Sequence, residues 1–259
     1  MAHAPRRRFG QNFLHDPGAI RRIVAAISPR PHQRLVEIGP GEGAITLPLL
    51  AAAGALDVVE VDRDLVAPLA QRAAGLGTLR IHNCDALTLD LCTLAPAPER
   101  LRVVGNLPYN ISTPLLFHLL GQLACIADMH FMLQKEVVDR MVATPGSHAY
   151  GRLSVMVQYR CRAQRLFTIG AGAFRPAPKV ESAFVELIPH EQPPVTVRDP
   201  QVFARVVRQA FSQRRKTLRN ALRGLLEAGE IEALGIDPAL RPEKLDLAAF
   251  AALANAAGP

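Results

Sequence analysis

The sequence predicts an α/β fold, in which a doubly wound sheet forms a large first domain and a small all-α domain follows at the C-terminus. At 35–53 an apolar strand leads through a glycine turn into a helix, which is the unit that such sheets repeat. Apolar strands and helical segments then alternate to about residue 141. Beyond a proline-rich linker at 189–194 the pattern is helical to the end. We expect the two domains to span 1–190 and 191–259.

The chain begins with a basic segment, Met1 to Phe9, which carries three consecutive arginines. We interpret this segment as a flexible arm. Asp16 and Pro17 then supply an N-cap and a first-turn proline, so a helix is expected from this point to Ile27. The proline-punctuated stretch at 28–31 ends that helix.

The glycine turn at 37–43 reads Glu-Ile-Gly-Pro-Gly-Glu-Gly and precedes a helical segment at 44–53. We predict that Gly39 and Gly41 border a bound nucleotide, because a Cβ would hold the turn away from an adenosine or its attached chain. Since the spacing Gly39-x-Gly41-x-x-Ala44 also fits the fingerprint of dinucleotide sites, this turn alone does not identify the cofactor.

Glu60 lies 21 residues beyond Gly39, at the end of a second apolar strand at 56–61. An acid at this distance is placed beside the turn, where it accepts both ribose hydroxyls and disfavours a 2′-phosphate. A solvated strand-end carboxylate is the alternative, and Asp62 is close enough to be mistaken for Glu60. We assign ribose binding to Glu60.

A helix at 64–74 and a third strand at 79–82 follow, and the chain then leaves the sheet through Asp85. This carboxylate is placed to accept a hydrogen bond from an adenine amino group. A helix N-cap is the equally weighted alternative for Asp85.

The fourth strand, at 101–105, delivers Asn106-Leu107-Pro108-Tyr109 to the same edge of the sheet. An aromatic amine such as adenine N6 is a poor nucleophile, and hydrogen-bond acceptors on its hydrogens draw the nitrogen toward a tetrahedral geometry. Asn106 offers a side-chain carbonyl, and Leu107 offers a backbone carbonyl held extended by Pro108. Tyr109 offers a flat ring face for a base. An ordinary Asn-Pro turn is the alternative that we consider weaker.

The remaining segments of the first domain are a helix face at 115–120, a fifth strand at 126–133, further helices at 134–141 and 152–159, and a turn-rich loop between these helices. The alternating segments at 163–169 and 180–188 predict a closing antiparallel pair. Phe174 lies between these two strands, where a lone Phe is more often part of a core than of a site.

The C-terminal segment at 200–226 is amphipathic, although Arg214 breaks its pattern and indicates that it contains two helices. Helices near 227–234 and 245–256 complete the small domain. We predict that phosphate groups of RNA bind to one basic face of this segment, which comprises Arg205, Arg208, Arg215, Lys216, Arg219 and Arg223. A solvated charged face is the alternative.

The formal charge of +7 and the isoelectric point near 9.7 also indicate a polyanionic partner, with a basic surface kept for solubility as the alternative. No apolar run has the length of a membrane span, and no signal peptide is evident. An Arg-rich organelle presequence is the alternative for the N-terminal arm. Since the four cysteines show no metal-site spacing, we expect reduced thiols in a cytoplasmic protein without a metal.

Four motifs together resemble the adenine dimethyltransferases of small-subunit ribosomal RNA. They are the glycine turn at 37–43 and the segments at 10–14, 106–112 and 174–182, and the resemblance extends from Phe9 to about Leu226. It implies a Rossmann-like class I methyltransferase sheet and transfer of two methyl groups to N6 of each of two adjacent adenosines near the 3′ end of that RNA. The implied methyl donor is S-adenosylmethionine, bound by residues matching Asn12, Leu14, Gly39, Glu60, Asp85 and Asn106.

The resemblance also implies that Phe174 faces the extruded base opposite Tyr109, which reverses the preference for a core role. The implied partner is an immature small ribosomal subunit, on which the protein acts as a monomer. Three alternatives remain open: a related RNA methyltransferase with another target, an NAD-linked dehydrogenase, and an assembly factor that binds RNA without catalysis. The Asn106–Tyr109 motif disfavours the dehydrogenase.

Overall fold

The computed structural model describes residues 11–213 and 215–258. The predicted arm at 1–9 and Arg214 lie outside the described residues. The chain forms two compact units: the first extends through Val138 and includes Gln164–Pro189, and the second combines Asp139–Ala163 with the segment from His190 onward. The segment 139–163, which the sequence placed in the first domain, thus belongs to the second unit.

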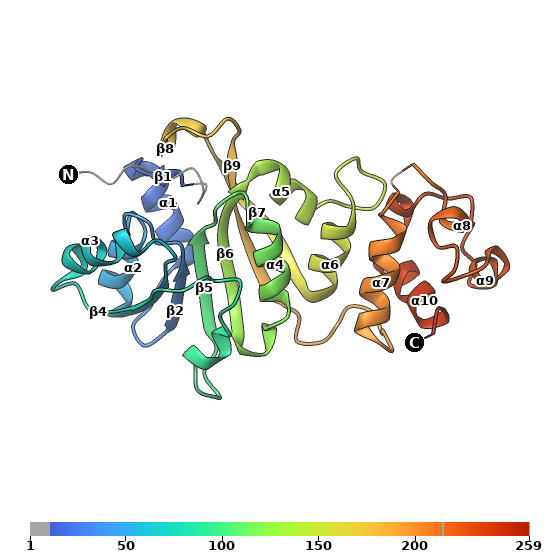
Figure 1. Cartoon of the computed structure of the whole chain (residues 1–259), viewed down its shortest axis with the longest axis horizontal. Helices are drawn as coiled ribbons and strands as arrows, with labels where there is room; N and C mark the ends of the chain where they lie inside the picture. The colour runs from blue at the N-terminus through green and yellow to red at the C-terminus, as the bar shows by residue number, and fades with distance from the viewer. Residues whose placement is uncertain (1–10, 214, 259) are drawn as a thin grey trace. The chain divides into compact units, whose positions relative to one another are not determined.

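A seven-stranded sheet in the order β4-β3-β2-β5-β6-β9-β7 forms the centre of the first unit (Figure 1). Strands β2 to β6 run parallel where they pair, and β9 lies antiparallel to β6. The chain order reverses between β2 and β5, which is where ligands bind in open sheets of this kind. The strands are β2 (Arg34–Ile38), β3 (Ala55–Val59), β4 (Thr78–His82), β5 (Leu101–Asn106), β6 (Ile126–Gln134), β7 (Cys161–Ile169) and β9 (Ser182–Pro189).

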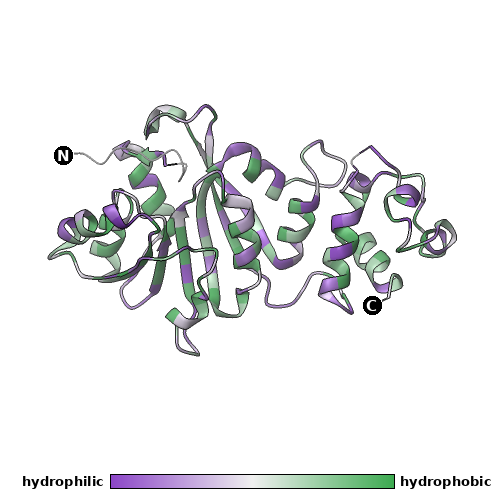
Figure 2. Ribbon diagram, viewed as in Figure 1, coloured by the Kyte–Doolittle hydropathy of each residue, from purple (hydrophilic) through white to green (hydrophobic). Residues whose placement is uncertain are grey.

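The helices α1 (Pro17–Ile27), α2 (Thr46–Ala53), α3 (Arg63–Ala73), α4 (Ser112–Leu120) and α5 (Lys135–Met141) connect these strands. Helix α1 begins as predicted, because the Asp16 carboxylate accepts a hydrogen bond from the Ala19 N–H at 2.6 Å. Helix α2 begins two residues later than predicted, because the glycine turn continues through Ile45. Hydrophobic residues run along the central strands and the inner helix faces (Figure 2).

Two short strands that the sequence did not predict, β1 (Phe13–Leu14) and β8 (Phe174–Arg175), pair antiparallel beside the main sheet. The register places Leu14 opposite Phe174, and both side chains are buried in the core of the first unit. This pairing attaches the segment before α1 to the segment before β9.

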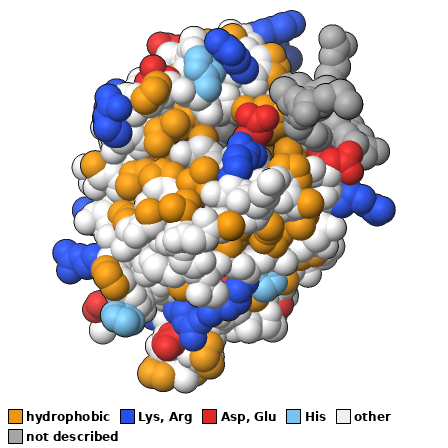
Figure 3. Space-filling view, turned by 90° about the vertical axis from the view of Figure 1, so that its left-hand side faces the viewer, with side chains coloured by type: hydrophobic (Ala, Val, Ile, Leu, Met, Phe, Trp, Pro, Cys, Tyr) orange, Lys and Arg blue, Asp and Glu red, His pale blue; other side chains and the backbone are white. Residues whose placement is uncertain are grey.

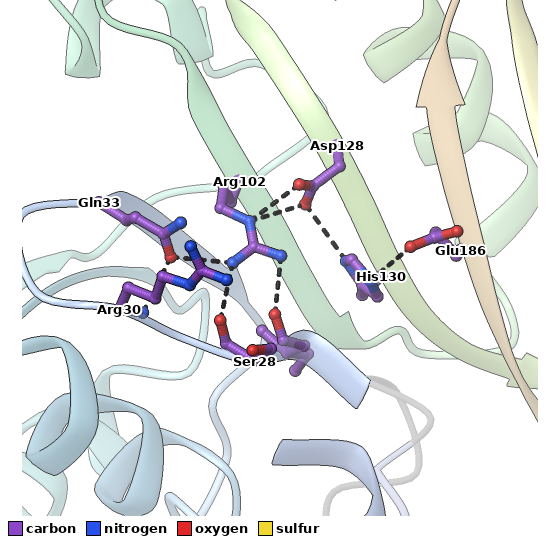
Figure 4. Close-up of polar contacts among 8 residues, drawn as sticks. Ser28, Arg30, Gln33, Arg102, Asp128, His130 and Glu186 are labelled. Carbon is purple, nitrogen blue, oxygen red and sulfur yellow. Dashed lines mark hydrogen bonds and ion pairs between the residues drawn. The ribbon is translucent and has the colours of Figure 1, made fainter. Parts of the chain in front are cut away.

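A network of charged residues lies near the amino ends of β5 and β6 (Figure 4). Arg102 donates to both carboxylate oxygens of Asp128, and its other nitrogens donate to the carbonyls of Ile27 and Ser28 and to Gln33. Burial alone would raise the pKa of Asp128, but His130 and Arg102 lower it. The network links α1 to the sheet at the edge opposite the predicted site.

The second unit is helical, with its own core formed by side chains such as Tyr159, Phe203 and Phe250. Helix α6 belongs here because Tyr159 packs on Phe203 with ring centroids 4.5 Å apart. The helices are α6 (Arg152–Arg160), α7 (Pro200–Ala210), α8 (Leu218–Ala221), α9 (Ala228–Ala233) and α10 (Leu247–Ala256). The 3₁₀ segment η5 (Pro242–Lys244) also lies in this unit, whereas η2 (Leu91–Leu94), η3 (Leu123–Cys125) and η4 (Ala171–Ala173) lie in the first unit.

The segment 200–226 is not one continuous helix, because α7 ends at Ala210 and α8 begins only at Leu218. The chain turns between them, so that Phe211 contacts the rings of Tyr150 and Phe250 while Leu218 reaches the same core. The single basic helix face predicted for this segment is therefore wrong, although the two helices that Arg214 indicated are present.

The prediction of four reduced cysteines is wrong for one pair. Cys92 and Cys125 form a disulfide, because η2 and η3 bring their Cα atoms to 5.3 Å across a separation of 33 residues. Cys84 and Cys161 are free thiols. In the part of the chain that is described, no helix combines the length and apolar character needed to cross a membrane.

Candidate functional site

A cavity of about 210 Å³ opens in the first unit at the carboxyl ends of β2, β3 and β5. Its lining contains the residues predicted to bind the donor and the target base, with the exception of Phe174. These residues are Asn12, Leu14, Gly39, Gly41, Glu60, Asp85, Asn106, Leu107, Pro108 and Tyr109.

The glycine turn forms one wall of the cavity, with positive φ at Gly39 (70°) and Gly41 (55°). A Cβ at Gly41 would lie only 3.0 Å from the Phe13 ring, and one at Gly39 would lie 3.7 Å from the Asn106 carbonyl oxygen. Positive φ favours glycine at both positions, and the close approach of Phe13 adds to this requirement at Gly41. The turn thus lies directly beside the Asn106–Tyr109 motif.

Glu60 is buried, and its carboxylate accepts hydrogen bonds from the Gly41 N–H at 3.1 Å and from the Asp62 N–H at 2.9 Å. Burial raises the pKa of Glu60, while these two hydrogen bonds oppose the shift. The Asp62 carboxylate instead caps α3 and accepts a hydrogen bond from the Gln11 side chain. The geometry therefore favours Glu60 over Asp62 as the acceptor at the cavity wall.

Asp85 lies on the cavity wall in a turn that follows β4. Its Oδ1 accepts a hydrogen bond from the Leu87 N–H at 2.9 Å, and its side chain is exposed. No helix begins at this position, so the expectation of a helix N-cap is wrong, and Asp85 caps a turn instead.

Asn106 ends β5, and its amide orientation is set by a hydrogen bond from Nδ2 to the Asn12 carbonyl at 3.0 Å. This amide assignment leaves Oδ1 as an acceptor at the cavity. The N–H of Leu107 donates to the Met132 carbonyl on the neighbouring strand, and the N–H of Ile111 donates to the Pro108 carbonyl. The motif is therefore fixed both to the sheet and within its own turn.

Tyr109 supplies an aromatic wall, and its hydroxyl lies 2.6 Å from the Ser182 hydroxyl. Burial raises the pKa of Tyr109, so the phenol stays protonated at neutral pH. The ring can therefore serve as an uncharged, flat surface for a base.

Phe174 does not occupy the position that the resemblance implied. Only 2% of its surface is exposed, it packs in the core of the first unit, and it is absent from the cavity lining. Its strand β8 pairs with β1, which turns the ring inward beneath Leu14. A contact with a base would require Phe174 to leave this packing.

Glu37 is a cavity residue to which sequence reasoning gave no role. It is buried in β2, and neither carboxylate oxygen has a hydrogen-bond partner. Burial raises its pKa to about 8; the nearby Thr46 hydroxyl opposes this shift although it is not aligned as a hydrogen bond, and Glu60 adds to it. An ionisable residue between the apolar residues Val36 and Ile38 of a central strand was the signal that could have identified it.

The six basic residues predicted to bind RNA lie in the second unit and do not share one environment. Arg205 is half-buried and donates to the Gly258 carbonyl, whereas Arg208, Arg215, Lys216 and Arg219 are exposed. Arg223 is also exposed and donates to the Asn220 side chain at 3.2 Å. Figure 3 views the left-hand end of Figure 1, which belongs to the first unit, and there hydrophobic side chains gather near the centre among basic and acidic ones.

The reversal of strand order, the glycine turn and the acid-lined cavity at the strand ends define a class I methyltransferase fold. The chain matches the model of the family described as ribosomal RNA adenine dimethylase over residues 2–257. The chain belongs to this family and is a methyltransferase.

Two relatives illustrate the similarity. The ribosomal RNA small subunit methyltransferase A of Pseudomonas fluorescens is 58% identical over 253 residues, which cover 98% of this chain and 94% of that protein. The protein of the same name from Pseudomonas aeruginosa is 59% identical over 254 residues, with the same coverage of both chains.

Two solved structures are similar over nearly the whole chain. A dimethyladenosine transferase from Plasmodium falciparum is 25% identical with a TM-score of 0.78, covering 93% of this chain and 95% of that one. The 23S rRNA methyltransferase ErmE is 24% identical with a TM-score of 0.74, covering 95% of this chain and 99% of that one. The likeness to ErmE establishes the fold alone.

Proposed function

We propose that this enzyme uses S-adenosylmethionine to dimethylate N6 of two adjacent adenosines near the 3′ end of small-subunit ribosomal RNA during ribosome assembly. The observation that carries the proposal is the meeting of Asn106, Tyr109 and the glycine turn in one cavity, in a chain 58% identical to a ribosomal RNA small subunit methyltransferase A. The Asn106–Tyr109 motif suits an aromatic amine, and the glycine turn suits an adenosine.

The residues of the cavity fit S-adenosylmethionine. Gly39 and Gly41 have positive φ in the turn that forms one wall, the Glu60 carboxylate at that wall is the proposed ribose acceptor, and Asp85 is exposed on the wall to accept from an adenine amino group. The main chain at Asn12 and Leu14 borders the same space. The positive charge of a bound donor would also favour the ionised form of the buried Glu37 carboxyl.

When bound, S-adenosylmethionine supplies a methyl carbon activated by a sulfonium leaving group. The enzyme orients the target base: Asn106 Oδ1 and the Leu107 carbonyl accept the N6 hydrogens, and the Tyr109 ring packs on the base. The sulfonium would supply the methyl carbon with neutral sulfur as the leaving atom, while Asn106 and Leu107 would hold the amine in line and water would take up its proton after transfer. Proximity and orientation supply most of the acceleration.

The proposed partner is an immature small ribosomal subunit, on which the enzyme acts as a monomer in the cytoplasm. A sulfonium electrophile needs no Lewis acid, so the proposal includes no metal. The exposed basic residues of the second unit, Arg208, Arg215, Lys216, Arg219 and Arg223, are proposed to bind phosphates of the RNA.

The test is transfer of tritiated methyl groups to unmethylated immature small subunits, followed by primer extension to map the modified nucleotides. We expect paired stops at two adjacent adenosines near the 3′ end. Asn106→Ala should lower turnover by about 100-fold or more, because one acceptor aimed at the reacting amine is lost. Donor binding should persist in part.

Asn255→Ala is the matched control, since the Asn255 amide is also hydrogen-bonded to the main chain but lies outside the cavity. It should retain normal turnover. Near-normal turnover by Asn106→Ala, or methylation mapped to large-subunit RNA, would contradict the proposal.

A further inference from the structure

The side chain of Ser182 is fully buried, and its hydroxyl contacts the aromatic wall of the cavity from behind. Ser182 Oγ lies 2.6 Å from Tyr109 Oη, across a separation of 73 residues. Ser182 does not line the cavity, and the proposed chemistry gives it no part in binding either the donor or the base. Its position is nevertheless tied to the site through Tyr109.

The sheet topology explains how Ser182 reaches Tyr109. Strand β6 lies between β5 and β9, with Met132 opposite Asn106 on one side and Gln134 opposite Ser182 on the other. Because β9 runs antiparallel, it begins at the edge where β5 and β6 end. The first residue of β9 is therefore held by the ladder at the place where β5 delivers Tyr109.

Tyr109 is held at both ends. At the backbone end, the Ser112 hydroxyl donates to the Tyr109 carbonyl at 3.1 Å. At the far end of the ring, the Ser182 hydroxyl contacts the phenol oxygen. Because Tyr109 is only half-buried, the contact of its hydroxyl with Ser182 restricts the side-chain torsions more than packing alone would.

We propose that Ser182 is a positioning residue, which holds the Tyr109 hydroxyl and thereby fixes the direction in which the ring that receives the target adenine points. This inference rests on the proposed function of the cavity. A ring that can tilt would place N6 off the line of attack, and displacements of about 1 Å can lower rates by about 100-fold. Donor binding does not involve the ring and is unaffected.

A purely structural role is the alternative, in which the two hydroxyls only satisfy each other's hydrogen bonding. Loss of the contact would then lower thermal stability and leave turnover intact. The alternatives differ in whether kcat changes in a protein that is still folded and still binds the donor.

The experiment compares Ser182→Ala, Tyr109→Phe and the double variant with the wild-type enzyme on immature small subunits. We expect each single variant to lower kcat by about 10-fold, within the range known for misplaced reacting groups. The dissociation constant for S-adenosylhomocysteine, measured by calorimetry, should stay within about twofold of wild type. The double variant should be no slower than either single variant, because all three lack the same hydrogen bond.

Ser154→Ala is the matched control, since Ser154 is equally buried and bonded to a main-chain carbonyl but lies in the second unit. It should lower the melting temperature and leave kcat unchanged. If Ser182→Ala does not fold, Tyr109→Phe still decides the question, because it keeps the ring and removes only the hydroxyl.

Single variants with kcat within twofold of wild type would overturn the inference, and so would effects that multiply in the double variant. An inactive wild-type enzyme would instead overturn the proposed function, and the inference with it. An active wild-type enzyme with unaffected variants would overturn the inference alone.

Discussion

Glu37 is a buried ionisable residue, and the folded protein loses free energy of unfolding when its carboxyl becomes charged. Its carboxyl is buried in β2 without a hydrogen-bond partner, and burial raises its pKa to about 8. A group whose pKa is higher in the folded than in the unfolded protein contributes stability below its unfolded pKa, and this contribution is lost as pH rises through the folded pKa. For Glu37 the loss extends from about pH 4.5 to about pH 8.

We therefore expect Glu37→Gln to stabilise the donor-free protein increasingly between pH 5.5 and pH 8, because the amide cannot ionise. The gain in free energy of unfolding should be on the order of 3 kcal/mol at pH 7. Urea titrations at several pH values measure it. Glu191→Gln, which changes an exposed carboxyl, is the control and should show no such trend. A gain that does not vary with pH would contradict the explanation.

Most individual site residues could be predicted from the sequence, because each occupies a defined place relative to a strand end. Glu60 follows the apolar strand β3 and Asn106 ends β5, and parallel strands bring their carboxyl ends together. Ser182 could not be predicted, because its contact with Tyr109 depends on the register of β9 with β6, which no local pattern specifies.

Strands β1 and β8 are elements that could not be predicted from the sequence. Long apolar strands and amphipathic helices were located from their periodicity, but a two-residue strand has no period to detect. The break after α7 was indicated by Arg214, but its position could not be predicted, since Leu218 and Leu222 keep the helical spacing although the chain turns before them. Tertiary packing decides both features.

The burial of Phe174 in β8 predicts how substitution of this residue changes the stability of the protein. Because the ring packs in the core, Phe174→Ala should lower the free energy of unfolding by about 3–5 kcal/mol, and Phe174→Leu should lower it by clearly less. Thermal and chemical unfolding of the donor-free enzyme measure both. In folded Phe174→Leu, kcat on immature subunits should stay close to wild type.

Tyr109→Leu provides the comparison, because it removes the aromatic wall that does line the cavity. It should lower kcat far more than Phe174→Leu does. Equal losses of kcat in the two Leu variants, with unchanged stability in Phe174→Leu, would restore the base-facing role that the resemblance implied.

At the scale of the whole molecule, one unit contains the cavity proposed to bind the donor, and the other contains the exposed basic residues proposed to bind RNA. The change from alternating strands to helices revealed this division in the sequence. The sequence could not show that 139–163 belongs to the second unit, because Val155 and Tyr159 join the core around Phe203 only through long-range packing.

The basic residues of the second unit predict a specific dependence of RNA affinity on salt. Arg208 and Arg219 are exposed on α7 and α8, so each can neutralise a phosphate and release a counterion. Replacing either by Ala should weaken binding to small-subunit ribosomal RNA and reduce the slope of log K against log[KCl] by about 0.7–0.9. Filter binding over a series of KCl concentrations measures both quantities.

Arg205→Ala is the comparison in the same experiment, because it removes a positive charge from a half-buried side chain and not from an exposed one. Its Nε is buried and its Nη2 donates to the Gly258 carbonyl at 3.2 Å, so its guanidinium already binds the main chain near the end of the second unit. Arg205→Ala should therefore lower the melting temperature and leave the salt slope unchanged, although it removes the same charge as Arg208→Ala. A slope that falls equally in both variants would mean that net charge, and not the exposed position of a side chain, governs how this enzyme holds RNA.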